Sequence, residues 1–178
     1  MAIDFSGRTV MVTGAAGNLG RAAAAAFAGY GANLVLVDLS REGLEKAYGE
    51  PTARRVLAPV NLLDSGEVDA AAKSAHARYR RLDVLCSIAG GFRMGEAVHE
   101  TTDKTWDFLM DVNVRTLLNA VRAVVPLMIE RGGGRIVNVG AFAAQKGVAR
   151  MGAYCASKSA VIRLTESLAP SCARRTST

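Results

Sequence analysis

Two side chains near the end of the chain have the types and the spacing for proton transfer. Tyr154 and Lys158 lie four residues apart in the run Tyr-Cys-Ala-Ser-Lys, which on a helix places them on one face, one turn from each other. A free phenol titrates near pH 10 and is a poor acid–base catalyst at neutral pH, but a nearby ammonium favours the phenolate and lowers that pKa. The spacing fits an acid–base pair, but by itself it does not favour that interpretation. The alternative is an exposed helical Tyr/Lys pair without a role, because this spacing also arises by chance.

A glycine-rich turn near the start of the chain could bind phosphate. Residues 13–20 read Thr-Gly-Ala-Ala-Gly-Asn-Leu-Gly, between the apolar run 9–12 and the alanine-rich run 21–28. This pattern predicts a strand, a turn and a helix. The first turn of a helix has unpaired N–H groups and the positive end of the dipole, and glycines let a pyrophosphate approach the backbone. The alternative is a tight turn without a ligand.

An acidic residue follows the next apolar run. Residues 33–37 read as a second buried strand, and Asp38 stands at its end, about 20 residues beyond the glycines, where a carboxylate accepts hydrogen bonds from the ribose hydroxyls of NAD. This placement favours a dinucleotide site over an empty turn.

Predicted strands and helices alternate along the chain, and they must position these residues. The pattern predicts one α/β domain, a three-layer doubly wound parallel sheet of the Rossmann type, with ligands at the carboxyl ends of its strands. The expected strands are 9–12, 33–37, 55–60, 84–88 and 135–139, and the expected helices are 21–28, 41–48, 64 or 65 to 79, 103–130 with a bend at Pro126, and 152–168.

Composition limits the class of protein. At 178 residues and 50% hydrophobic, the chain is enough for one domain with a sizeable core. It has no run of 18 apolar residues and no basic, apolar leader, so we expect a cytoplasmic protein with no membrane partner. The net charge of +6 is scattered apart from Arg78, Arg80 and Arg81, which predicts no nucleic-acid partner. Three cysteines without ligand spacing predict neither disulfides nor a metal site.

Taken together, residues 8–169 resemble the short-chain dehydrogenase/reductases. The motifs that carry the resemblance, in the order and spacing of the family, are the glycine turn, Asp38, Ala89-Gly90, Asn113, the run Gly-Arg-Ile-Val-Asn-Val at 134–139, and Tyr154 with Lys158.

The resemblance implies roles for these residues. It makes Tyr154 the proton donor or acceptor and Lys158 the ligand of the nicotinamide ribose, and it has Asn113 hold a water of the proton relay. It implies reversible hydride transfer between nicotinamide and a small carbonyl or alcohol substrate, and a homo-dimer or homo-tetramer assembled through helices 103–130 and 152–168. The residues expected to contact the cofactor, besides Tyr154 and Lys158, are Gly14, Gly17, Asn18, Leu19, Gly20, Asp38, Asn61, Leu62, Ala89 and Gly90.

The chain departs from the family pattern at four places. Asn18 replaces a glycine, Asn61 replaces an aspartate, and Ser87-Ile88 replaces two asparagines. Ala141 stands where the family has a catalytic serine, as in members similar to 3-oxoacyl-acyl-carrier-protein reductases that carry alanine there. By analogy with oxyanion donors, loss of that hydroxyl costs on the order of 10²–10³ in rate. The dihydropteridine reductase branch of the family, however, works with alanine at this place.

The charges near the glycine turn indicate the cofactor. Asp38 would repel a 2′-phosphate, and Ala16 and Gly17 occupy the region where NADP-preferring relatives often carry a basic residue. NAD is therefore the expected cofactor, while Arg41 nearby leaves NADP open.

The last nine residues do not resemble the family, whose members continue into further strands. We expect residues 1–169 to form the dinucleotide-binding domain, and we interpret 170–178 as a tail produced by a frameshift, because one coding of this tail gives a family-like sequence one base out of frame. We expect the edge strand at 135–139 to expose apolar surface and turnover to be low. Two readings remain: an oxidoreductase, and a dinucleotide-binding module whose catalytic activity is impaired or lost.

Overall fold

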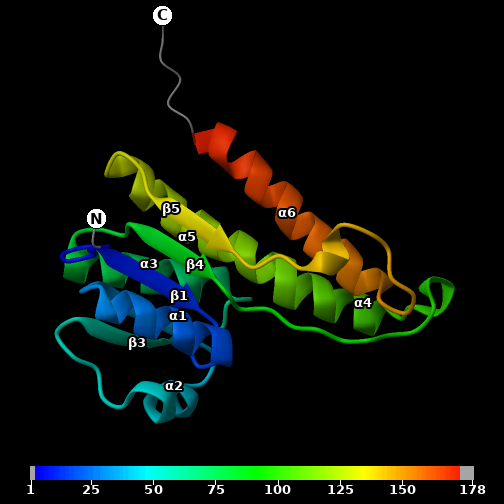
Figure 1. Cartoon of the computed structure of the whole chain (residues 1–178), viewed down its shortest axis with the longest axis horizontal. Coiled ribbons are helices and arrows are strands. Elements are labelled where there is room, and N and C mark those ends of the chain that lie inside the picture. Colours follow the sequence, from blue (N-terminus) through cyan, green and yellow to red (C-terminus); the bar gives the residue numbers. More distant parts are fainter. Residues whose placement is uncertain (1–2, 173–178) are drawn as a thin grey trace, which may run out of the picture. The chain divides into compact units, whose positions relative to one another are not determined.

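The computed structural model describes residues 3–172, which contain one five-stranded sheet (Figure 1). The chain divides into two compact units, residues 1–90 with 115–137 and residues 91–114 with 138–178. The strands are β1 (Thr9–Thr13), β2 (Asn33–Asp38), β3 (Arg55–Pro59), β4 (Val84–Ser87) and β5 (Arg135–Asn138). The helices are α1 (Asn18–Gly29), α2 (Arg41–Tyr48), α3 (Ser65–Tyr79), α4 (Asp103–Met110), α5 (Thr116–Glu130) and α6 (Gly152–Cys172).

The sheet has the strand order β3-β2-β1-β4-β5. β1 pairs in parallel with β2 and with β4, and β2 pairs in parallel with β3. The chain crosses from one edge to the middle of the sheet between β3 and β4, which is the arrangement of a doubly wound sheet. The predicted fold class is confirmed.

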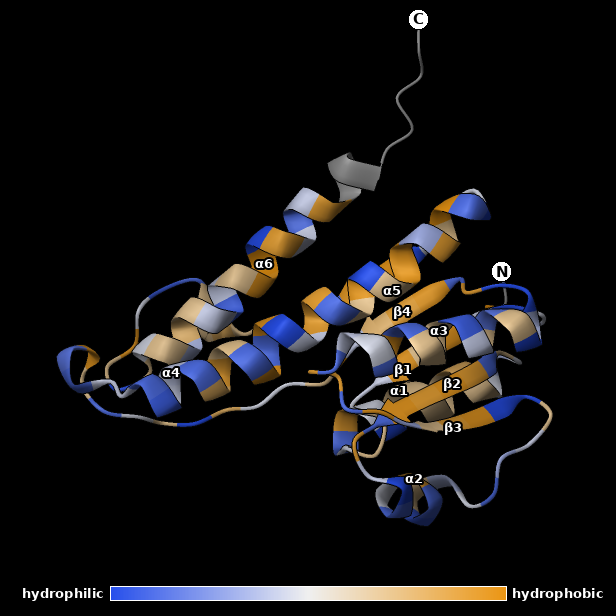
Figure 2. Cartoon of the chain, turned by 180° about the vertical axis from the view of Figure 1, so that it is seen from behind, coloured by the Kyte–Doolittle hydropathy of each residue, from blue (hydrophilic) through white to orange (hydrophobic). Residues whose placement is uncertain are grey.

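Alternate residues of the strands enter two separate cores. Met11 and Val35 face a cluster that includes residues of α3 and α5, whereas Val12 and Leu36 face a cluster that includes residues of α1 and α2. Figure 2 shows the apolar colouring of these strands between the helices. Because successive side chains of a strand point to opposite faces, a parallel sheet covered on both sides must be apolar throughout.

The predicted helix starts are confirmed for three helices. The side chains of Ser40, Asp64 and Thr102 accept hydrogen bonds from first-turn N–H groups of α2, α3 and α4, as N-caps do. After the C-terminal end of α5, Gly132 and Gly133 have φ angles of 89° and 130°, which accounts for the helix ending at Glu130, the expected end.

The long helical region differs from the expectation. We expected one helix over 103–130 with a bend at Pro126, but the interruption is a π-helical turn, Asp111–Arg115, and α5 continues through Pro126. The last helix also runs past its expected end at Leu168, as far as Cys172. The final residues of the tail, 173–178, lie outside the described residues.

Two features bear on the expected exposure of the edge strand and on the expected absence of a membrane partner. Val137 of the edge strand β5 is 54% exposed, as expected for that strand. The helical stretch Asp103–Glu130 is long and apolar enough to cross a membrane, but 44% of its most apolar window is buried inside the structure. α5 packs on α3, so this stretch has the pattern of a core helix.

Two glycines of the turn after β1 are required by close packing. Gly14 has φ +65°, and a Cβ there would lie 2.8 Å from the backbone nitrogen of Ala89. A Cβ at Gly20 would lie 2.8 Å from Cα of Ala15 and closer still to the carbonyl oxygen of Gly14. Gly20 thus lets α1 begin at Asn18, three residues before the expected start.

The loop before β4 holds three strands together through Asp83. Its carboxylate accepts a hydrogen bond from the Thr9 N–H (2.8 Å), and its own N–H donates to the Thr9 carbonyl. Its carbonyl accepts from the Arg135 N–H. Burial works to raise the pKa of Asp83, but the hydrogen bonds from Arg81 and Thr9, together with the charges of Arg81 and Arg8, outweigh it and lower that pKa.

We expect Gly14→Ala to lower the free energy of unfolding clearly more than Gly7→Ala. Both glycines have positive φ, 65° and 72°, but a Cβ at Gly7 meets nothing within 4 Å. The shared backbone cost is about 1–2 kcal/mol, and only Gly14→Ala adds the clash with Ala89. Urea unfolding of both variants measures the difference, and equal losses would contradict the close contact.

We expect Asp83→Asn to destabilise the protein at neutral pH and to do so less in acid. A carboxyl whose pKa is lowered by folding contributes stability above its unfolded-state pKa, and this contribution is lost as the pH falls through the folded-state value. The loss therefore sets in below the ordinary value of 3.8. Urea unfolding at about pH 7 and about pH 2.5 tests this. Asp69→Asn, which removes only an exposed ion pair with Lys73, is the control with little effect at either pH.

Candidate functional site

The start of α1 presents backbone N–H groups to solvent. Gly17, Asn18 and Leu19 are exposed. No side chain caps the helix, and no acidic residue lies in its first turn. First-turn N–H groups lack intrahelical partners. An exposed, uncapped helix start after a glycine turn fits the pyrophosphate of a dinucleotide.

Asp38 lies at the end of β2 and is bonded to the glycine turn. One carboxylate oxygen accepts from the Ala16 N–H at 2.9 Å and the other from the Leu39 N–H at 2.8 Å. The Tyr48 hydroxyl also binds the turn, donating to the Ala15 carbonyl at 2.6 Å. A carboxylate offers about four lone-pair sites, so the partly exposed Asp38 retains capacity for ribose hydroxyls while it fixes the turn.

Thr13 joins the glycine turn to the end of β4. Its hydroxyl oxygen accepts hydrogen bonds from the N–H groups of Ile88 (3.1 Å) and Ala89 (3.2 Å). This contact places Ala89 and Gly90, two of the predicted cofactor residues, beside the turn. Sequence reasoning treated Thr13 only as part of the turn. Its position at the end of a buried strand, opposite another strand end, was the available signal.

The segment after β3 is held from two sides. The Asn61 N–H donates to the Glu67 carboxylate at 2.8 Å, and the Asn61 side chain accepts from the Leu63 N–H at 3.0 Å. Asn119, buried in α5, donates to the carbonyls of Leu62 (2.9 Å) and Leu63 (3.2 Å). Asn119 was missed in the sequence analysis, although a polar residue within the apolar pattern of a helix can signal such a bond.

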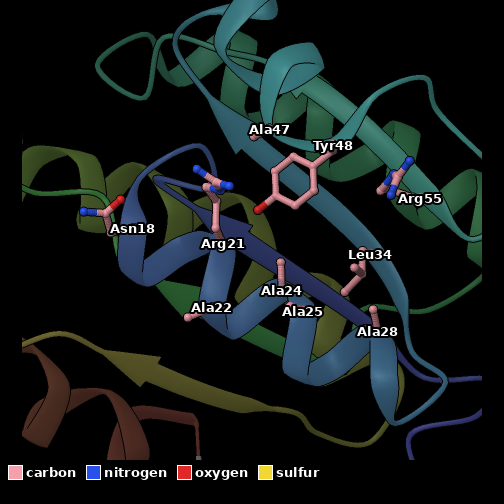
Figure 3. A pocket seen from close by; sticks show the side chains of 10 residues that line it. All are labelled: Asn18, Arg21, Ala22, Ala24, Ala25, Ala28, Leu34, Ala47, Tyr48 and Arg55. Atoms are coloured by element: carbon pink, nitrogen blue, oxygen red, sulfur yellow. The ribbon is translucent and has the colours of Figure 1, made fainter.

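A surface hollow of about 590 Å³ lies over α1, and Figure 3 shows its lining. Its floor is made largely of alanines, and Arg21, Tyr48 and Arg55 supply the larger polar side chains. Asn18 is the one predicted cofactor residue among those that line it. The hollow is therefore distinct from the carboxyl ends of the strands, where the predicted residues gather.

Asn113 is at the centre of a hydrogen-bonded chain in the second unit. Its side-chain oxygen accepts from the Gly91 N–H (3.0 Å), and its side-chain nitrogen donates to the Gly91 carbonyl (2.9 Å) and to the Ser157 hydroxyl (3.2 Å). Ser157 donates in turn to the Tyr154 carbonyl at 2.9 Å. Asn113 and Ser157 are buried, and Asn113 lies in the π-helical turn. The chain connects the loop after β4 to the first turns of α6. Ser157 was missed as a partner.

Lys158 is 6% exposed, one turn after Tyr154 on α6. Its ammonium donates to the Val139 carbonyl at 2.9 Å. Burial lowers the pKa of Lys158, because a low-dielectric environment disfavours the charged form. No hydrogen bond joins Lys158 to the Tyr154 hydroxyl among the described residues. The Tyr154 ring instead packs edge-on against Phe92, with centroids 4.9 Å apart.

Ala141 has an extended backbone and immediately precedes a short 3-10 helix, Phe142–Ala144. The hydroxyls of nearby α6 are otherwise engaged, since Ser157 donates to Tyr154 and Ser159 donates to the Ala144 carbonyl. Neither is free to replace the serine that the family carries at this place.

The predicted residues fall into two groups. Those of the glycine turn, Asp38, Asn61, Leu62, Ala89 and Gly90 lie in the first unit, while Asn113, Tyr154 and Lys158 lie in the second. In the first unit Asp38 is bonded to the glycine turn and Thr13 bonds the backbone of Ala89, and in the second unit Asn113 is linked through Ser157 to the Tyr154 carbonyl. Their roles toward a cofactor and a substrate stay predictions.

Comparison with known proteins identifies similar chains. A family model for short chain dehydrogenase matches residues 8–176. The chain is 36% identical to zebrafish (Danio rerio) dehydrogenase/reductase SDR family member 6 over 93% of its length and 65% of the relative's. It is also 36% identical to D-threitol dehydrogenase of Mycolicibacterium smegmatis, over 95% of this chain and 67% of that one.

This chain is also similar to the solved structure of a dehydrogenase. NAD+-bound xylitol dehydrogenase is similar with a TM-score of 0.84 and 31% identity, over 94% of this chain and 66% of that one. The chain thus spans about two thirds of the length of the relatives it matches. A family match over nearly the whole chain, together with the five-stranded fold, shows that the chain belongs to the short-chain dehydrogenase family.

Proposed function

We propose that the protein is a nicotinamide-dependent oxidoreductase that interconverts an alcohol and a carbonyl compound, with Tyr154 as general acid and base. The observation that carries the proposal is the buried Lys158 one helical turn from Tyr154, on a helix whose first turns are bonded through Ser157 to Asn113. Burial of a charged side chain costs free energy, and buried ionisable groups are therefore concentrated at functional sites. The family and the names of the relatives support the same reaction class.

The proposed reaction divides the work between the cofactor and the chain. When bound, the nicotinamide accepts or supplies a hydride at the reacting carbon. In the oxidation direction the Tyr154 oxygen would take the hydroxyl proton of the alcohol. In reduction Tyr154 returns a proton to the carbonyl oxygen. Lys158, one helical turn after Tyr154, would bind the nicotinamide ribose.

We propose NAD as the cofactor. The Asp38 carboxylate is bonded to the Ala16 N–H, so its negative charge is fixed beside the turn and opposes a 2′-phosphate. The similar xylitol dehydrogenase is NAD+-bound. Arg41, which begins α2, leaves NADP open.

The second candidate function is dinucleotide binding without efficient turnover, and Ala141 is the observation that favours it. No hydroxyl at this place can polarise a substrate carbonyl, a loss on the order of 10²–10³ in rate by analogy with oxyanion donors. Measurement of turnover beside cofactor binding decides between the two candidates.

The remaining expectations concern the substrate, the assembly, other partners and the cellular location. We propose a small carbonyl or alcohol compound as the substrate and a homo-dimer or homo-tetramer as the assembly. A cytoplasmic location, and the absence of nucleic-acid, membrane and metal partners, stay predictions.

We expect Tyr154→Phe to abolish turnover of small alcohols and ketones while the affinity for NADH changes less than about twofold, since the phenol oxygen takes part mainly in proton transfer. Absorbance of NADH at 340 nm measures turnover, and isothermal titration measures binding. Tyr30→Phe, at a surface position 42% exposed, is the control that retains both. Full turnover in Tyr154→Phe would contradict the assigned role, and NADH binding without turnover in the wild type would favour the second candidate.

We expect the free energy of unfolding of the wild type, minus that of Lys158→Met, to increase with pH. Burial lowers the folded-state pKa of Lys158 below the ordinary 10.5, so the unfolded state binds more protons between the two values. Stability therefore rises with pH across that window. Urea unfolding of both proteins between about pH 7 and pH 10.5 measures the difference. A difference independent of pH would contradict a buried ammonium, and loss of turnover in Lys158→Met is expected alongside.

A further inference from the structure

The loop after β4 is fixed by hydrogen bonds at both of its ends, Gly91 and Gly95, within the second unit. At one end, Asn113 binds both the N–H and the carbonyl of Gly91. At the other, the Gly95 N–H donates to the Arg150 carbonyl at 2.8 Å, and the Arg150 side chain donates back to the Gly95 carbonyl at 3.3 Å. A loop fixed at two points presents the residues between them in a defined arrangement, at little further entropic cost on binding.

The three residues between Gly91 and Gly95 are exposed, and they combine two apolar side chains with one cation. Phe92 and Met94 are 57% and 59% exposed, although large apolar side chains are usually covered. Phe92 lies edge-on against the Tyr154 ring. The apolar surface of this loop therefore begins directly beside the phenol proposed to transfer the proton.

Arg93 lies between them and is held by stacking. Its guanidinium carbon is 4.3 Å from the centroid of the Phe108 ring, a cation–π contact that fixes the group but uses none of its N–H donors. No ion pair or hydrogen bond engages Arg93 among the described residues. It is a pre-oriented cation with free donors.

Charged side chains of both signs line the small cavity beside Tyr154. Arg93, Glu96, Arg150 and Tyr154 line one small cavity, so two guanidiniums face one carboxylate. The Thr105 hydroxyl donates to Glu96 at 3.4 Å, and the Arg150 side chain is engaged with Gly95. The cavity of about 10 Å³ has room for about one water, so a larger ligand would bind on the exposed side of Arg93.

We propose that the substrates are organic acids, with Arg93 binding the carboxylate and Phe92 and Met94 contacting the apolar part. A planar guanidinium with free donors matches a carboxylate in bidentate geometry. The substrate then reaches Tyr154 across Phe92. This inference rests on the proposed oxidoreductase function and names the substrate class for the same site.

The test compares 3-hydroxyhexanoate with its methyl ester, each with NAD+, by kcat/KM. The wild type is expected to prefer the acid at least about tenfold, as a charge-assisted hydrogen bond gives. Arg93→Gln is expected to lose most of this preference, and Arg93→Lys to keep part of it. Arg122→Gln removes an exposed charge of α5 and is expected to keep the full preference. Equal rates for acid and ester in the wild type, or an unchanged preference in Arg93→Gln, would overturn the proposal.

A binding measurement separates this inference from the reaction itself. If the wild type turns over neither compound, the kinetic comparison gives no readout, and isothermal titration with hexanoate, which has no alcohol carbon to react, tests Arg93 independently of the reaction. Hexanoate is expected to bind Arg93→Gln at least about fivefold more weakly than the wild type or Arg122→Gln. Equal affinities would overturn the assignment of Arg93.

Discussion

The buried amide of Asn113 is the interaction on which the candidate catalytic region depends. Its side-chain oxygen accepts from the Gly91 N–H, and its side-chain nitrogen donates to the Gly91 carbonyl and to the Ser157 hydroxyl, all within the second unit. A buried amide left unpaired is costly, whereas a fully bonded one specifies a single arrangement. The π-helical turn that contains it adds a local irregularity of the kind often found at functional sites. The loop after β4 and the first turns of α6 are thereby tied to one side chain.

Much of the fold could be predicted from the sequence because its signals are local. Apolar runs of four to six residues predicted the strands, and the expected helix starts near residues 41, 64 and 103 agree with the structure, where Ser40, Asp64 and Thr102 cap the helices, since a cap binds backbone groups within three residues. The π-helical turn could not be predicted, because it depends on what the helix packs against. Pro126 offered a stronger local signal, yet α5 continues through it.

The candidate site was predictable in its residues more than in its contacts. Tyr154, Lys158 and Asp38 stand out by type and spacing. The partners that hold the site are distant in sequence: Thr13 and Ala89 are 76 residues apart, and Asn119 and Leu62 are 57 apart. Nothing in the local pattern of either pair specifies the other. For Lys158 the structure adds a partner that the spacing from Tyr154 did not indicate, because its ammonium donates to the Val139 carbonyl.

The Asp38 carboxylate has two roles in the proposed cofactor site. In the proposed preference for NAD its charge opposes a phosphorylated ribose, and one of its oxygens also binds the Ala16 N–H and so shapes the turn. A redesign toward NADP that replaced it with a small apolar residue would remove a repulsive charge and, in the same step, an acceptor that the backbone uses. A side chain that keeps an oxygen at this position, such as asparagine or serine, would relax cofactor preference while leaving the turn with a partner.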